Sequence, residues 1–140
     1  MLFRSTDQRI ELGYRGNRFV QLLFEGKSGH ASQESAYSTS SLPPLITFMN
    51  DLIRVRLELH RTYYHPTLGE PTFTPTRIEP AGVYSSNKTA SASYIAVDIR
   101  TTPELDQAFD SWLDQLASKY HFSYLSYNIN STFQLKLSQF

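Results

Sequence analysis

The chain has 140 residues, no cysteine, and thirteen basic residues balanced by thirteen acidic ones. This length fits one domain, the lack of cysteine excludes disulfides and thiolate metal ligands, and the neutral charge argues against a surface for nucleic acid or anionic membrane. No apolar run approaches the roughly 20 residues of a membrane span, and the N-terminus lacks the apolar core of a signal peptide, so a cytoplasmic location is expected.

Alternation with period two predicts a first strong strand over residues 17–26. Its core-facing side chains are expected to be Val20, Leu22 and Phe24. Residues 9–14 before it predict a short strand or lead-in. The polar, serine-rich residues 27–41 after it predict a loop.

Apolar residues at helical spacing predict one long helix from about Pro43 to Arg61. Ser41 lies near its N-cap, and proline is tolerated in the first turn of a helix. The residues of its expected buried stripe are Leu45, Phe48, Met49, Leu52, Ile53, Val55 and Leu59. After a loop, residues 72–80 alternate again, and Pro75 places this strand at the edge of a sheet.

A turn over residues 81–89 leads to the clearest strand, residues 91–100. Alternation assigns its core face to Ser93, Ile95, Val97 and Ile99. Arg100 lies on the opposite face, where a ligand can reach it.

A second helix is expected to begin at Pro103, with Thr102 as its N-cap, and to end near Lys119. Its apolar stripe comprises Leu105, Phe109, Trp112, Leu113 and Leu116. Residues 122–129 predict the last core strand, and residues 131–140 predict a further strand or a tail.

The order strand–helix–strand–strand–helix–strand predicts an α+β fold of the ferredoxin-like βαββαβ type. Two right-handed crossover units in this order give a four-stranded antiparallel sheet with two helices on one face. Because many unrelated functions use this sandwich, the fold alone does not define the function.

The residue patterns of a self-sufficient hydrolase are missing. Among the four histidines, His30, His60, His65 and His121, none starts an H-x-D or H-E-x-x-H segment. The helically spaced aspartates Asp106, Asp110 and Asp114 fit a solvated helix face better than a metal site. No metal ligand is therefore expected in this chain.

Two segments resemble the motifs of a known family. The first runs from residues 12–16 (LGYRG) through a strand to residues 26–32 (GKSGHAS), and the second runs from Gly82 past Asn87 to residues 98–100 (DIR). Together they resemble the dimerisation (lid) domain of the dinuclear zinc aminoacylase/carboxypeptidase family. That family includes acetylornithine deacetylase, succinyl-diaminopimelate desuccinylase and glutamate carboxypeptidase.

The resemblance has departures that concern loop geometry. Residues 33–35 (QES) stand where the family often has proline, and Ala90 stands at another common proline position. Residues 12–16 favour the deacetylase branch of lysine and arginine biosynthesis. The acyl group and the amino acid of the substrate are not defined by this sequence.

The resemblance implies that residues 1–140 are a single lid domain, with its core at about 9–130, whose catalytic domain lies outside this chain. The parent enzyme would cleave the amide bond of N-acyl amino acids or small peptides with two zinc ions held in that catalytic domain. This chain would hold no cofactor and would be inactive alone. It would form a homodimer through an edge strand and the first helix, with no nucleic acid or membrane as partner.

The resemblance also implies the roles of three residues. His30 would reach into the partner subunit's active site and donate a hydrogen bond to the oxyanion, which imidazole chemistry allows. Asn87 and Arg100 would bind the carboxylate of the substrate, for which the planar guanidinium is well suited.

Other interpretations remain open at this point. His30 fits an ordinary loop histidine, Asn87 fits a turn, and Arg100 fits a surface pair with Asp98 or Glu104. A stand-alone ferredoxin-like module that senses a carboxylated metabolite is the alternative function. An RNA-binding sandwich is a third possibility, and the neutral charge argues against it.

Overall fold

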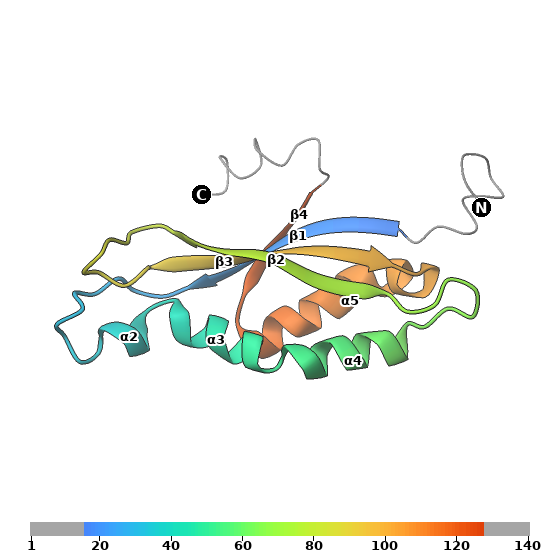
Figure 1. Cartoon of the computed structure of the whole chain (residues 1–140), viewed down its shortest axis with the longest axis horizontal. Helices are drawn as coiled ribbons and strands as arrows, with labels where there is room; N and C mark the ends of the chain where they lie inside the picture. Colours follow the sequence, from blue (N-terminus) through green and yellow to red (C-terminus); the bar gives the residue numbers. More distant parts are fainter. Residues whose placement is uncertain (1–15, 128–140) are drawn as a thin grey trace.

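The structure is a computed structural model that describes residues 16–127 of the chain (Figure 1). Its elements are β1 (Gly16–Glu25), α2 (Ala36–Thr39), α3 (Leu42–Asn50), α4 (Leu52–Thr62), β2 (Thr72–Ala81), β3 (Ala92–Thr101), α5 (Pro103–Tyr120) and β4 (Ser123–Tyr127). The strand predicted over 9–14 and the element predicted over 131–140 lie outside the described residues.

The four strands form one sheet in the order β2-β3-β1-β4, and every neighbouring pair is antiparallel. The helices cover one face of this sheet (Figure 1). The predicted βαββαβ sandwich is therefore confirmed. β2 is an edge strand, as Pro75 predicted, and its register shifts between Pro75 and Arg77.

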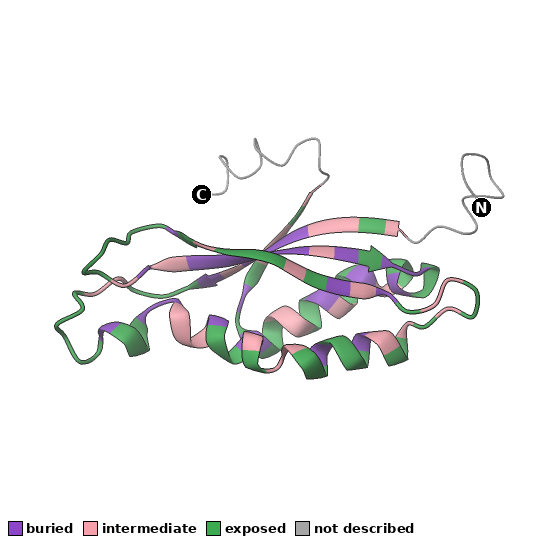
Figure 2. Ribbon diagram, in the orientation of Figure 1, coloured by how far each residue is buried: buried purple, intermediate pink, exposed green. Residues whose placement is uncertain are grey.

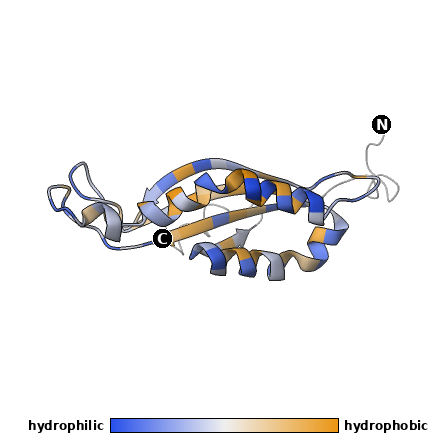
Figure 3. Cartoon of the chain, turned by 90° about the horizontal axis from the view of Figure 1, so that it is seen from below, coloured by the Kyte–Doolittle hydropathy of each residue, from blue (hydrophilic) through white to orange (hydrophobic). Residues whose placement is uncertain are grey.

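The core lies between the sheet and the helices, where buried residues line the inner sides of both layers (Figure 2). The alternation in β1 and β3 buries the predicted side chains Val20, Leu22, Phe24, Ser93, Ile95, Val97 and Ile99. Along the helices, hydrophobic residues alternate with hydrophilic ones (Figure 3). The helices thus expose polar residues to water and bury apolar ones against the sheet. The other face of the sheet carries a second, smaller buried cluster of Ala81, Tyr94 and Ala96.

The single long helix predicted from Pro43 to Arg61 is two helices, and this prediction is wrong. Asp51 lies between α3 and α4 with φ −91° and ψ 3°, and its carboxylate accepts a hydrogen bond from the Tyr120 hydroxyl at 2.7 Å. Aspartate favours helix ends over helix interiors, because its side chain competes for local hydrogen bonds. The contact with α5 holds that break in place.

Ile53 was predicted to be buried and instead has 73% of its surface exposed. Leu45, Phe48, Val55 and Leu59 follow the three- and four-residue spacing of one helix face, and all four are buried. Ile53 follows directly after Leu52, so it lies about 100° around the helix from that face. It belongs to an outward flank of α4.

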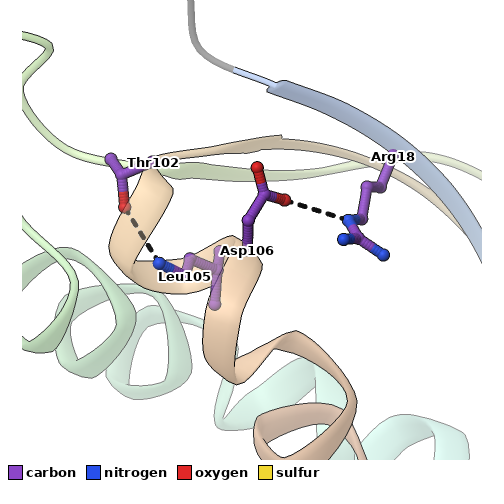
Figure 4. Close-up of polar contacts among 4 residues, drawn as sticks. All are labelled: Arg18, Thr102, Leu105 and Asp106. Carbon is purple, nitrogen blue, oxygen red and sulfur yellow. Dashed lines mark hydrogen bonds and ion pairs between the residues drawn. The ribbon is translucent and has the colours of Figure 1, made fainter.

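The N-cap predicted for α5 is confirmed (Figure 4). The Thr102 hydroxyl oxygen accepts a hydrogen bond from the Leu105 N–H at 3.2 Å and donates one to the Tyr63 carbonyl at 2.7 Å. On the next turn, Asp106 forms an ion pair with Arg18 of β1 at 3.1 Å. The start of α5 is therefore tied to both the sheet and the end of α4.

The Tyr120 hydroxyl makes the stability of the fold depend on pH in the alkaline range. Burial, and then its hydrogen bond to Asp51, raise the pKa of Tyr120 from 10.0 to about 12. Between those two values the native state keeps a proton that the unfolded chain loses, so the free energy of unfolding falls as pH rises from about 10 to about 12. Tyr120→Phe should lower stability at pH 8 by about 1 kcal/mol and should flatten this alkaline decline.

Urea unfolding of the wild type and the variant from pH 8 to pH 12 measures the effect. Tyr37→Phe is the matched control, because it removes a hydroxyl from an exposed tyrosine and not from a buried one. A hydrogen bond to Asp114 raises the pKa of Tyr124 to about 12 as well. The variant should therefore still lose some stability as the pH rises, but less than the wild type. Identical slopes in wild type and Tyr120→Phe would contradict the assignment.

Candidate functional site

Two loops pair with each other at one end of the sheet. We call residues 26–35 and 82–91 the paired loops; the first follows β1 and the second joins β2 to β3 (Figure 1). The Thr89 N–H donates to the Gly29 carbonyl at 2.9 Å, and the Ala31 N–H donates to the Asn87 carbonyl at 2.8 Å. This antiparallel pairing extends the sheet beyond its ends and holds the two loops in a defined register.

Gly26 allows the first of the paired loops to pass close to α2. A Cβ atom at Gly26 would lie 2.4 Å from the carbonyl carbon of Ser40, and main-chain atoms cannot move aside as a flexible side chain can. The Thr89 hydroxyl adds a clamp, because it accepts a hydrogen bond from the Gly29 N–H at 2.9 Å. Glycine at one position and threonine at the other thus set the path of the loop that carries His30.

His30 is exposed at the tip of the paired loops. Its Nδ1 lies 2.8 Å from the Ser32 hydroxyl and accepts a hydrogen bond from the Ser32 N–H at 3.2 Å. Its Nε2 lies 3.4 Å from the Asn87 amide nitrogen, and the Asn87 amide oxygen accepts from the Ser85 hydroxyl at 2.9 Å. The pairing therefore brings together His30 and Asn87 on the surface, away from the core of their own domain.

Arg100 lies at the opposite end of β3. Eight residues separate it from Ala92, where β3 leaves the paired loops, and at about 3.3 Å per residue this distance is about 26 Å. Its guanidinium binds Asp98 with two hydrogen bonds, Nε to Oδ1 at 3.0 Å and Nη2 to Oδ2 at 3.1 Å. Within one domain, Arg100 is therefore far from His30 and Asn87. It forms the surface pair with Asp98 that was one of the open interpretations.

Ser32 and Ser85 are site residues for which the sequence analysis predicted no role. Ser32 stands inside the histidine motif, and its position in that motif is the signal that it lies close to His30. Ser85 carries no such signal, because its contact with Asn87 depends on the shape of the turn.

Within residues 16–127, no group of three or more histidine, cysteine or acidic side chains lies close enough to hold a metal ion. The aspartates of α5 are exposed, and Asp106 and Asp114 bind Arg18 and Tyr124. Over the same residues, no helix combines the length and the apolar character needed to cross a membrane.

Comparison with known proteins gives a likeness of fold. No protein-family model matches the sequence, and no curated protein matches it. Among solved structures, an amidase of the hydantoinase/carbamoylase family from Burkholderia phymatum matches with TM-score 0.61 and 18% identity, over 81% of this chain and 28% of that one. The domain has the fold of a segment of such amidases.

Further solved structures give the same result. A putative aminohydrolase from methicillin-resistant Staphylococcus aureus matches with TM-score 0.52 and 18% identity, over 82% of this chain and 30% of its own. AtUAH in complex with glyoxylate matches with TM-score 0.53 and 15% identity, over 80% of this chain and 27% of its own. The chain therefore spans less than a third of the proteins it matches. The predicted resemblance is confirmed at the level of the fold.

Proposed function

We propose that this domain is the dimerisation domain of a zinc-dependent amidohydrolase that cleaves the amide bond of N-acyl amino acids or small peptides. Its catalytic domain would lie outside this chain, where zinc polarises the scissile carbonyl and activates the attacking water. The role of this domain is to supply His30 to the active site of the partner subunit. Its fold, shared with a segment of larger amidases, supports this proposal.

The observation that carries the proposal is the exposed pair of His30 and Asn87. The two side chains come from separate loops, are held by main-chain hydrogen bonds, and face away from their own core. An imidazole N–H is suited to bind a polarised carbonyl oxygen, and the neighbouring Asn87 amide can contribute a donor for the carboxylate of the same substrate. Within residues 16–127, neither side chain belongs to the buried core.

The position of Arg100 favours a pocket that two subunits share. About 26 Å of β3 separates Arg100 from Ala92, and Asn87 lies in the loop beyond Ala92. A twofold axis beside the sheet places the two ends of neighbouring domains next to each other. We therefore assign His30 and Asn87 of one subunit and Arg100 of the other to the same pocket, where Arg100 would exchange Asp98 for the carboxylate of the substrate.

The proposed dimer surface comprises the outer flank of α4 and the adjacent edge strand β2. Ile53 and Leu57 are exposed by 73% and 54%, and Ile78 of β2 is exposed by 51%. α4 packs beside β2, so these side chains lie along one side of the domain. An open strand edge next to exposed apolar side chains is the usual composition of a symmetric interface.

A mixed-dimer experiment tests the proposal. Residues 16–127 replace the corresponding segment of an amidase of the matched kind, and the active chimera is made in two defective versions. One version carries His30→Ala, and the other keeps His30 but has a substituted metal ligand in its catalytic domain. Mixing should restore about a quarter of the activity, because about half of the randomly paired dimers are mixed and each has one complete pocket.

The separate versions are the controls and should stay inactive. A mixture as inactive as its components shows that His30 does not act across subunits, and a chimera that sediments only as a monomer excludes the shared pocket. Hydrolysis of N-acyl amino acids by the pure 140-residue chain with added zinc would refute the assignment of catalysis to another domain.

A further inference from the structure

We infer that the main-chain N–H of Ser32 holds the neutral His30 ring in the tautomer that carries its proton on Nε2. Ser32 is then a positioning residue, because it acts on the substrate only through His30. The inference deepens the proposed function, on which its catalytic meaning rests. The tautomer itself is a property of this chain and is measurable without an active enzyme.

The Nδ1 side of the ring fixes the assignment. The Ser32 N–H points at Nδ1 over 3.2 Å, and a main-chain N–H is always a donor. Nδ1 must therefore present its lone pair, and the single ring proton of neutral histidine must be on Nε2. The Ser32 hydroxyl, 2.8 Å from Nδ1, can rotate to donate as well.

The contacts of Nε2 also fit a proton on this atom, provided that the Asn87 amide turns its oxygen towards the ring. An Nε2–H group facing the amide nitrogen at 3.4 Å would set two donors against each other. The two ends of an amide are assigned from their hydrogen bonds, and turning this one places its oxygen beside Nε2–H and its nitrogen beside the Ser85 hydroxyl. Because a hydroxyl accepts as well as donates, every group then has a suitable partner.

This tautomer is the one that oxyanion binding requires. The ring atom turned towards Asn87 must donate a hydrogen bond if negative charge develops on a nearby oxygen. With its proton on Nδ1, the same ring would present a lone pair to that charge and repel it. In the free domain, the side-chain amide oxygen of Asn87 accepts the hydrogen bond from Nε2–H until a substrate oxygen takes its place.

The same chain contains internal references for a locked and an unlocked ring. His65 Nδ1 accepts hydrogen bonds from the main-chain N–H groups of Thr67 at 3.0 Å and Leu68 at 3.1 Å, so its proton is also held on Nε2. His121 ends α5 as an exposed residue, and no fixed donor among the described residues faces its ring. Its two tautomers are therefore free to exchange.

Nitrogen-15 NMR of the labelled chain, at a pH where the imidazoles are neutral, tests the inference. Long-range proton–nitrogen spectra give the separation between the shifts of the two ring nitrogens, which is largest when one tautomer is fixed. We expect the shift separation of His30 to equal that of His65 and to exceed that of His121. We also expect Nε2 to be the protonated nitrogen of His30. A separation equal to that of His121, or a proton on Nδ1, overturns the inference.

Two variants of Ser32 separate the roles of its N–H and its hydroxyl. Ser32→Ala keeps the main-chain donor, so the shift separation of the two His30 ring nitrogens should stay equal to that of His65. Ser32→Pro removes the donor and should shift His30 to the His121 value while His65 stays unchanged. If Ser32→Pro perturbs the fold, the wild-type comparison and Ser32→Ala still decide the question.

The outcome is distinguishable from a failure of the proposed function. A fixed tautomer in the free domain, together with unchanged turnover after His30→Ala in the chimera, refutes the catalytic role and leaves the lock intact. An averaged tautomer together with a large loss of turnover refutes the lock and leaves the catalytic role intact.

Discussion

Replacing His30 with alanine in the dimeric chimera is expected to lower kcat by about 10²–10³-fold, equivalent to about 3–4 kcal/mol of transition-state stabilisation. The imidazole would meet the carbonyl oxygen only as negative charge develops on it, so its loss should affect kcat far more than KM. Steady-state kinetics with an N-acyl amino acid measures both constants, and sedimentation confirms that the variant remains a dimer.

His121→Ala is the matched control, because His121 is also an exposed histidine outside the core and lies outside the paired loops. It should leave kcat within about twofold, because its side chain lies at the C-terminal end of α5 and not in the paired loops. A His30→Ala variant that raises KM alone would show that His30 binds substrate and transition state equally. That result would exclude the oxyanion role.

Phe48→Ala is expected to lower the free energy of unfolding by about 3–5 kcal/mol, because it removes a large side chain and leaves a cavity that the core fills only in part. Phe48 is completely buried. Four aromatic rings lie with their centroids 5.2–6.2 Å from its own, those of Phe24, Phe73, Tyr120 and Phe122. These rings come from the sheet and from the segment around the end of α5, so Phe48 joins both layers.

Urea unfolding followed by circular dichroism measures this loss. Val83→Ala is the control, because Val83 is exposed by 58% and should change stability by less than about 0.5 kcal/mol. A loss below about 1 kcal/mol for Phe48→Ala would mean that the surrounding rings collapse into the space. In that case Phe48 would not be the residue that joins the two layers.

Local patterns in the sequence were sufficient to predict most of the fold. The alternation in β1 and β3 identified their buried faces, Pro75 identified the edge strand, and Thr102-Pro103 identified the start of α5. Each of these signals acts within a few residues, so it is readable without tertiary structure. The break at Asp51 was missed because the hydroxyl that holds it comes from Tyr120, 69 positions away.

The candidate site was predictable in part. The motif around His30 and the position of Asn87 indicated two loop residues, and the register of the paired loops determines that they meet. The separation of Arg100 from His30 and Asn87 follows from the length of β3, and the alternation over residues 91–100 already predicted that length. The assignment of Asn87 and Arg100 to one carboxylate site stays a prediction, and the rise per residue of an extended strand means that two subunits would be needed to form it.

The irregularity of β2 limits how far this protein can assemble. A regular exposed strand templates the addition of further strands without end, which is how amyloid fibrils grow. Pro75 offers no N–H for such growth, and the shift between Pro75 and Arg77 breaks the repeat that stacking needs. The β2 edge is therefore suited to a single partner rather than to continuous strand addition.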